Sequence, residues 1–346
     1  MNPPEEILNQ EQNEDELYEH HRFVIDKGKE PVRIDKYLTD IIPNISRNRI
    51  QNATEAGSVL VNGKSVKSNY KIRPHDVIQV VLPNPVWDYT VEPENIPLDI
   101  VYEDDDVLLI NKKAGMVCHP GHGNFHGTLV HALLWHCKEL PEISDTMRPG
   151  LVHRLDKNTS GLIIIGKSEH ALTHLSKQFF DRTIKRHYIA LVWGDMEKQE
   201  DRIVSNITRN PNNRKTFIAV EEEHIGKFAA TNYEVQKRYG YTTLVKCKLE
   251  TGRTHQIRVH LKYIGHTLFG DYSYGGDQIL SGTIYGKYKT FIENCFALMP
   301  YHALHAQSLG FVHPRTNEEL YFEVPLPENY QKVIEKWETY SKGFKL

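Results

Sequence analysis

Residues 149–167 read PGLVHRLDKNTSGLIIIGK, a compact polar cluster placed directly before an apolar run. The run from Leu162 to Ile165 is short and β-branched, which predicts a buried strand. Asp156 is the only carboxylate of this segment and is flanked by cations. A loop that holds one carboxylate against a strand is a common way to present a catalytic acid or nucleophile. A turn in which Asp156 caps the strand entry explains the same residues equally well.

The composition indicates a globular protein with a sizeable core. A chain of 346 residues with 39% hydrophobic content predicts two or three domains. The net charge is -3, but acidic residues concentrate in residues 1–30 and mask a more basic remainder. The four cysteines form no CxxC pair, no apolar run reaches membrane-spanning length, and the N-terminus lacks a signal-peptide pattern. We therefore expect reduced thiols in a cytoplasmic protein that does not enter a membrane.

Shifts in composition predict four segments. Residues 1–31 form an acidic, flexible tail, and residues 32–82 form a small independent module. Residues 83–97 are rich in proline and read as a linker, and residues 98–346 form a larger domain.

The small module combines two helices, a hairpin and a basic polar side. Ile34, Leu38 and Ile41 fall on one helix face, Ser46 is a candidate N-cap for a second helix, and Asn62-Gly63 predicts a hairpin turn. Clustered cations suggest binding of an RNA phosphate backbone, whereas an ordinary solvated face is the alternative. The cations that we assign to RNA binding are Arg47, Arg49 and Lys64.

The larger domain is predicted to be α+β. Strands dominate and helices interrupt them without strict alternation, which favours a mixed, largely antiparallel sheet over a doubly wound fold. A second polar cluster spans Leu249–Leu261, where Ile257 and Val259 alternate with polar residues and predict a strand. Such a strand would present Arg258 to a cleft, and the planar forks of Arg253 and Arg258 can bind phosphate or a carboxylate.

These motifs carry a resemblance to known families. RIDKYL at 33–38, with Ser46-Arg47 and VNGK at 61–64, resembles an S4 RNA-binding domain. HRLDKNTSG at 153–161 resembles the catalytic motif of RluA-type pseudouridine synthases, and KRHYIALVWG at 185–194 matches their tyrosine motif. Residues 249–261 with Gly270-Asp271 match their arginine motif. The order of these motifs behind an S4-like module is similar to RluD-type enzymes that act on large-subunit ribosomal RNA.

The resemblance implies a pseudouridine synthase fold behind a small α/β S4-like domain, and an isomerase that works without a cofactor or metal. Asp156 would be the nucleophile on a flipped-out uridine, and Arg258 would lower its pKa. Tyr188 would pack on the uracil, and Arg154 would fill the space that the base leaves. The resemblance further implies RNA contacts and a monomer, with these remaining substrate-binding residues: Thr159, Arg253, His255 and Gln256.

Several alternatives stay open on sequence grounds. His119, His122 and His126, with Cys118 and His131, could gather a metal, but their spacing fits no standard zinc pattern. A non-catalytic RNA-binding or ribosome-assembly protein would need only the S4-like module. A hydrolase of N-glycosides would also use a carboxylate beside a sugar, and the same isomerisation could take place on transfer RNA.

Overall fold

The computed structural model describes residues 18–42, 45, 47–55, 57–82, 91–121, 124–141, 148–213, 215–222 and 224–343. Contacts divide the chain into one unit that ends at Thr90 and a second that begins at Val91. Ser46 and residues 83–90 of the predicted linker lie outside the described residues. In the part that is described, no helix is both long and apolar enough to cross a membrane.

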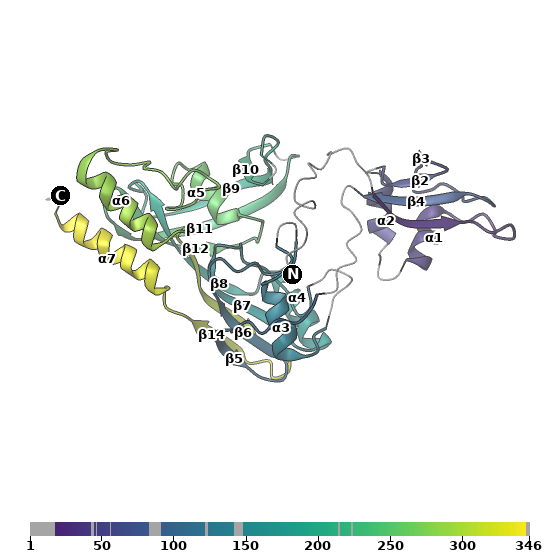
Figure 1. The fold of residues 1–346 in the computed structure, drawn as a ribbon, viewed down its shortest axis with the longest axis horizontal. Helices are drawn as coiled ribbons and strands as arrows, with labels where there is room; N and C mark the ends of the chain where they lie inside the picture. Colours follow the sequence, from purple (N-terminus) through teal and green to yellow (C-terminus); the bar gives the residue numbers. More distant parts are fainter. Residues whose placement is uncertain are drawn as a thin grey trace, which may run out of the picture. The chain divides into compact units, whose positions relative to one another are not determined.

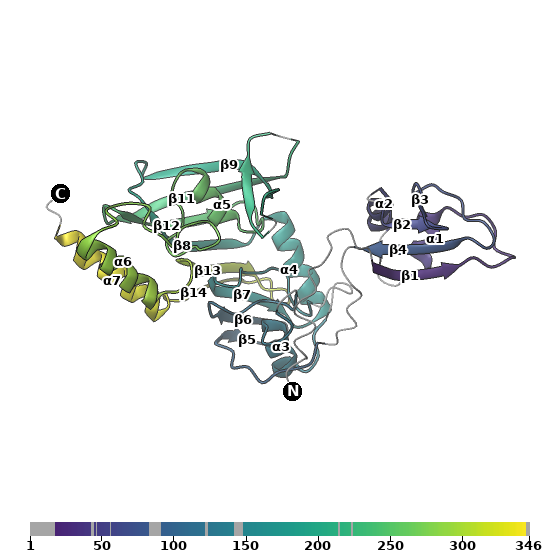
Figure 2. The same ribbon diagram turned by 45° about the horizontal axis from the view of Figure 1, so that its top comes forward.

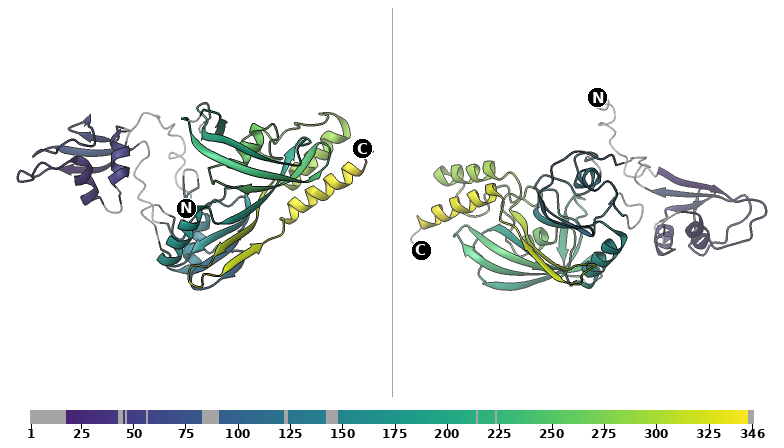
Figure 3. Two further views of the ribbon diagram at one scale, coloured as in Figure 1. Left: turned by 180° about the vertical axis from the view of Figure 1, so that it is seen from behind. Right: turned by 90° about the horizontal axis from the view of Figure 1, so that it is seen from below.

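The first unit is a four-stranded sheet with two helices on one face (Figure 3). Its strands follow the order β1-β4-β2-β3, and its core joins the apolar side chains of both layers, among them Ile34, Leu38, Val59 and Ile78. Its elements are β1 (Tyr18–Val24), α1 (Ile34–Ile41), α2 (Arg47–Glu55), β2 (Val59–Val61), β3 (Lys64–Ser65) and β4 (Val77–Leu82).

The predicted tail of residues 1–31 is too long. Tyr18–Val24 forms β1, which pairs antiparallel with all of β4. The sequence signal is weak because Phe23 and Val24 are the only apolar side chains between Tyr18 and Val24. Backbone pairing along β4 therefore fixes this strand where its own apolar pattern does not.

The second unit is built on a ten-stranded sheet in the order β10-β9-β11-β12-β8-β13-β7-β6-β5, with β14 paired to β13 (Figure 2). Neighbouring strands are antiparallel except for β13 and β7. The predicted mixed, largely antiparallel sheet is thus confirmed. Its strands are β5 (Ile100–Glu103), β6 (Val107–Lys112), β7 (Ser160–Gly166), β8 (Lys185–Trp193), β9 (Glu200–Arg209), β10 (Phe217–Val220), β11 (Lys227–Arg238), β12 (Thr242–Leu249), β13 (Leu304–Val312) and β14 (Glu319–Glu323).

Helices cover both faces of this sheet, and the alternation of β8 shows how. Tyr188 and Ala190 pack into the core that holds α3 and α5, whereas Ile189 and Leu191 pack into the core beneath α6 and α7. The paired helices α6 and α7 lie side by side in Figures 1 and 3. The helices are α3 (Leu129–Cys137), α4 (Glu169–Asp181), α5 (Gln256–Tyr263), α6 (Gly286–Leu298) and α7 (Glu328–Lys342).

The pairing between neighbouring strands of this sheet is shortest between β7 and β13. Only two residue pairs join these strands, His305 with Ser160 and Ala306 with Gly161. Gly161 has a φ of 111°, and a Cβ at this position would collide with the backbone of Ala306. Glycine is therefore required for the close approach of the two strands. The junction fixes the start of β7, which directly follows the loop that carries Asp156.

The prediction that the second polar cluster is a strand is wrong. β12 ends at Leu249, and the helix α5 begins at Gln256. Ile257, Leu261 and Ile264 share one core at the helical spacing i, i+4 and i+7, and this repeat outweighs the short alternation.

Candidate active site

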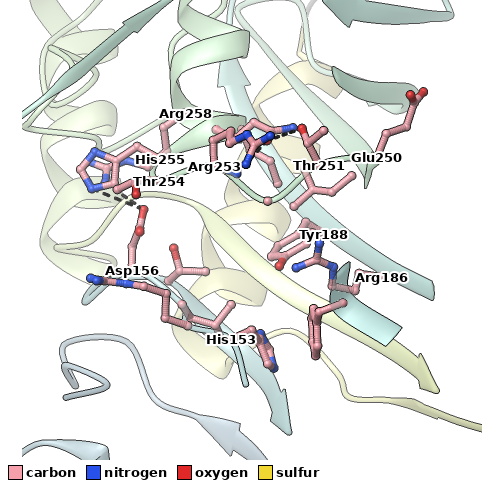
Figure 4. A pocket seen from close by; sticks show the side chains of 18 of the residues that line it. His153, Asp156, Arg186, Tyr188, Glu250, Thr251, Arg253, Thr254, His255 and Arg258 are labelled. Carbon is pink, nitrogen blue, oxygen red and sulfur yellow. Dashed lines mark hydrogen bonds and ion pairs between the residues drawn. The ribbon is translucent and has the colours of Figure 1, made fainter. Parts of the chain in front are cut away.

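A cleft of about 500 Å³ opens between the loop before β7 and the segment that leads into α5 (Figure 4). Its walls come from residues 152–159, the end of α4, the start of β8 and residues 249–258. Four segments that are distant in sequence therefore converge on one cavity. The cleft holds the predicted catalytic residues Asp156, Tyr188 and Arg258 together.

Arg258 bridges two carboxylates at the inner end of the cleft. Its Nη1 donates a hydrogen bond to Asp156 at 3.0 Å. Its Nε and Nη2 donate to the two carboxylate oxygens of Asp271 at 2.7 and 2.8 Å. The side chain of Asp271 is fully buried and that of Arg258 is 5% exposed. The bidentate pair fixes the guanidinium and aims its remaining edge at Asp156.

The surroundings of Asp156 favour its ionised form. Burial raises the pKa of Asp156, but the positive charges of His255 and Arg258 outweigh it and the net shift is downward. Burial also lowers the pKa of His255 and so disfavours its charged form, whereas a guanidinium such as Arg258 keeps its charge. Burial opposes the charge on Arg258, but Asp271 and Asp156 raise its pKa above the ordinary value. The result is an ionised carboxylate in a largely buried place.

His255 closes this end of the cleft. It precedes α5 in the left-handed backbone region, with a φ of 56°. Its Nε2 lies 3.8 Å from Asp156, and its Nδ1 is hydrogen-bonded to the hydroxyl of Tyr274 at 2.9 Å. The ring of Tyr274 also faces the guanidinium of Arg258 at 4.8 Å. His255 is thus held beside the nucleophile candidate.

Tyr188 lies on the sheet floor of the cleft beside Arg186 (Figure 4). Burial raises the pKa of the Tyr188 hydroxyl, against the opposing charge of Arg186. The phenol is therefore protonated near neutral pH and can donate a hydrogen bond or a proton. Its ring offers a flat apolar surface to a base.

Two residues that were predicted to contact the substrate use their polar groups in hydrogen bonds within the protein. The hydroxyl of Thr159 is hydrogen-bonded to His302 at 2.8 Å and is buried. The amide of Gln256 donates to Ala230 and Thr231 and accepts from Thr251 and Arg253. Thr159 and Gln256 therefore shape the walls of the cleft, and their polar groups do not point freely into it.

Two predicted cations lie at the cleft with spare donors. Arg154 is exposed, and its Nη1 is 3.1 Å from Nε2 of His119. Arg253 donates from Nε to the carbonyl of Phe228, which leaves its two Nη groups for other partners.

The small unit uses one of its predicted RNA contacts internally. Asp35 is fully buried and accepts hydrogen bonds from Arg33, Arg47 and Gln51, which ties α1 to α2. Arg47 remains half-exposed, and Lys64 is exposed on β3. The side chain of Arg49 lies outside the described residues.

The structure does not bring together all the histidines that could have bound a metal. His126 and His131 approach Glu94, and their donor atoms lie within 4.8 Å of one another. Cys118 instead donates to the carbonyl of Leu155, and His119 is engaged with Arg154. His122 lies outside the described residues.

Sequence reasoning missed three side chains of the site. Asp271 holds Arg258, His302 holds Thr159, and Arg186 adjoins Tyr188. Asp271 and Arg186 lie inside the quoted motifs, so the motifs contained this signal. His302 follows an irregular segment and leaves no pattern in the sequence.

Comparisons with known proteins agree with this geometry. An RNA pseudouridylate synthase profile matches residues 106–263, and an S4 domain profile matches residues 32–78. The chain is 47% identical to an uncharacterized RNA pseudouridine synthase of Chlorobaculum parvum, over 91% of this chain and 97% of that protein. It is 40% identical to the ribosomal large subunit pseudouridine synthase D of Nitrosomonas europaea, over 88% of this chain and 84% of that protein.

A solved structure supports the same fold. Human RNA pseudouridylate synthase domain containing 1 superposes with a TM-score of 0.50 at 25% identity, over 69% of this chain and 85% of that one. The predicted S4 domain and pseudouridine synthase fold are therefore confirmed. The chain belongs to the RNA pseudouridine synthases, isomerases that convert uridine in RNA into pseudouridine.

Proposed function

We propose that this protein isomerises specific uridines of large-subunit ribosomal RNA, with Asp156 as the nucleophile. The observation that carries the proposal is the position of Asp156. Its carboxylate is kept ionised by Arg258 at 3.0 Å, inside a cleft whose floor is Tyr188. This is the arrangement that a buried nucleophile requires.

The reaction breaks the bond between N1 of uracil and C1′ of ribose and forms a bond from C5 of the same base to C1′. The base stays in the cleft while it turns, so the reaction needs no external group donor or redox partner. Arg258 holds Asp156 as a carboxylate, and Tyr188 packs against the ring. The uracil loses the proton on C5 and gains one on N1, so the isomerisation leaves the number of protons unchanged. Removing the base from its stack costs roughly a few kcal/mol. Arg154, exposed at the mouth, fills the vacated place.

Binding energy from elsewhere on the RNA offsets that cost. Arg253 and His255 line the cleft and contact the target strand, and Thr159 and Gln256 hold the cleft walls. The S4 domain adds a second contact through Arg47, Arg49 and Lys64, and a linked second site raises the effective affinity.

Large-subunit ribosomal RNA is the substrate that the relatives favour. Proteins of Nitrosomonas europaea, Zymomonas mobilis and Neisseria meningitidis at 38–40% identity bear the name ribosomal large subunit pseudouridine synthase D. We extend that substrate class to this chain, together with a cytoplasmic location and action as a monomer.

The test is to map pseudouridine in ribosomal and transfer RNA from cells that carry the wild type, Asp156→Asn or no copy of the gene. We expect positions in the large-subunit RNA to lose modification in both altered strains. The control Asp277→Asn changes an exposed carboxylate outside the cleft and should restore every position. Losses confined to transfer RNA would refute the substrate, and full modification with Asp156→Asn would refute the nucleophile.

Purified Asp156→Asn protein separates the remaining alternatives. It should bind the RNA as the wild type does, since a neutral amide of nearly the same size and shape replaces the carboxylate. A non-catalytic assembly factor would leave RNA unmodified even with the wild-type protein. A hydrolase would release free uracil, whereas the isomerase releases none.

A further inference from the structure

The cleft extends beyond the reaction centre around Asp156. Past Tyr188 its lining continues to the end of α4, where it includes Phe179, Phe180, Arg182 and Arg186. A volume of about 500 Å³ lies within the roughly 300–1,000 Å³ of cavities that enclose a drug-sized ligand. The reaction centre around Asp156 occupies the opposite end.

Phe179 and Phe180 differ sharply in their surroundings. Phe179 is fixed between the ring of His153, 4.5 Å away, and the guanidinium of Arg186, 5.2 Å away. Phe180 points about 100° away around the helix and is 85% exposed. A single exposed phenylalanine is ordinary, but this one lies on the wall of the cleft.

The outer end of the cleft is positively charged. The carboxylates among its described lining residues are Asp156 and Glu250. Glu250 is already paired with Arg202 through two hydrogen bonds, at 2.7 and 2.8 Å. The charge of Arg182 also acts on Glu250, so Arg182, Arg186 and Arg202 together outnumber this one carboxylate.

Arg182 occupies a backbone position that normally favours glycine. It follows the last turn of α4 with a φ of 61° in the left-handed region. Glycine or asparagine is the usual residue at such a helix end. Arg182 therefore exposes its guanidinium beside the cleft, although an arginine in this backbone conformation is less stable than a glycine.

We propose that the outer end of the cleft binds the nucleotide next to the target uridine, with its base stacked on Phe180 and its phosphate held by Arg182 and Arg186. When the target uridine leaves the stack, its neighbour loses a stacking partner. Phe180 replaces that partner, and the two arginines hold the backbone in its bent path. The proposal rests on the proposed function only in taking Asp156 as the reacting end.

Arg182→Gly tests the phosphate contact without harming the fold, because glycine relieves the left-handed backbone. Lys138→Gly is a matched control, since Lys138 ends α3 with a φ of 56°, is exposed and lies outside the cleft. We expect Arg182→Gly to reduce the slope of log affinity against log salt by about 0.7, the value for one phosphate of a single strand. Lys138→Gly should leave that slope unchanged. Equal slopes for the wild type and Arg182→Gly would overturn the phosphate contact.

Phe180→Ala tests the stacking contact in a double-mutant cycle. The substrate is a short RNA that the wild-type enzyme modifies, with an intact or a base-free nucleotide at the position 5′ or 3′ of the target. We expect Phe180→Ala and one of the two base-free RNAs each to lower kcat/KM about tenfold, within the range for one base stacked on an aromatic ring. Combined, they should give no further loss.

The exposed aromatic Tyr285 supplies the control, and Tyr285→Ala should behave as the wild type with every RNA. Fully additive losses on both sides of the target would overturn the stacking contact. Because every RNA in the test is one that the wild type modifies, these results do not depend on which RNA class is the natural substrate.

Discussion

Arg258→Lys should destabilise the protein and disable the site although it keeps the charge. Arg258 makes three hydrogen bonds to two carboxylates, the fully buried Asp271 at 2.7 and 2.8 Å and the largely buried Asp156 at 3.0 Å. An ammonium cannot match the bidentate fork to Asp271 and reach Asp156 as well. Hydrogen bonds to charged groups contribute roughly 1.5–3 kcal/mol each. Losing one or two of them predicts a fall of about 1.5–6 kcal/mol in the free energy of unfolding.

The free energy of unfolding can be measured by urea titration, and kcat/KM by pseudouridine formation in a modified RNA. We expect kcat/KM to fall at least about 100-fold, since one charge-stabilising donor contributes roughly that much at other sites. Arg253→Lys is the matched control, because Arg253 lies five positions earlier and bonds only a carbonyl through Nε in the described structure. It should change stability by less than about 0.5 kcal/mol. If Arg258→Lys kept the free energy of unfolding within about 0.5 kcal/mol and kcat/KM within about twofold of the wild type, the bridging role of Arg258 would be wrong.

Three further changes test other parts of the structure. Arg258→Gln removes one of the charges that lower the pKa of Asp156, so the acid limb of single-turnover rate against pH should move to higher pH. An unmoved limb would contradict the role of Arg258 as a charge partner of Asp156. Gly161→Ala should unfold the protein at a urea concentration far below that of Gly240→Ala, because a Cβ meets backbone at the first position and open space at the second; equal midpoints would contradict the close strand approach. Asp35→Asn should destabilise the S4 domain by about 2–3 kcal/mol. Burial raises the pKa of Asp35, but its hydrogen bonds lower the pKa by a larger amount, so the net shift is downward. The stability that Asp35 contributes is therefore fully present above the unfolded pKa of about 4 and is lost as the pH falls through the folded value. The free energies of unfolding of the wild type and the variant should converge at low pH.

The sequence predicts the parts of this protein whose signals are local. Leu162–Ile165 is a buried strand, the small domain has the expected helices and hairpin, and the larger sheet is mixed and largely antiparallel. The motif residues Asp156, Tyr188 and Arg258 lie in one cleft. Each of these predictions depends on hydrophobic period, turn chemistry or motif order, which are written in consecutive residues.

The wrong predictions concern features that depend on residues distant in the sequence. β1 exists because β4 offers it a pairing edge, and α5 is a helix because Ile257 and Leu261 pack on the sheet core. Gln256 and Thr159 have polar side chains that suit RNA, yet neighbours far along the chain occupy their hydrogen-bonding groups. Polar residue type predicts the capacity to bind, and only the fold determines what is bound.

The same logic explains why catalysis and folding are coupled at this site. Asp156 precedes β7, Arg258 lies on α5, and Asp271 follows in a later loop, so the charge network forms only when three separate segments have docked. A buried carboxylate pays a large desolvation penalty without such partners. The docking of α5 therefore creates the conditions under which Asp156 is ionised, and the narrow β7–β13 junction at Gly161 holds the other side of the network in place. Variants that loosen either element should lose activity before they lose the fold, because the network depends on contacts about 3 Å long whereas the sheet core does not.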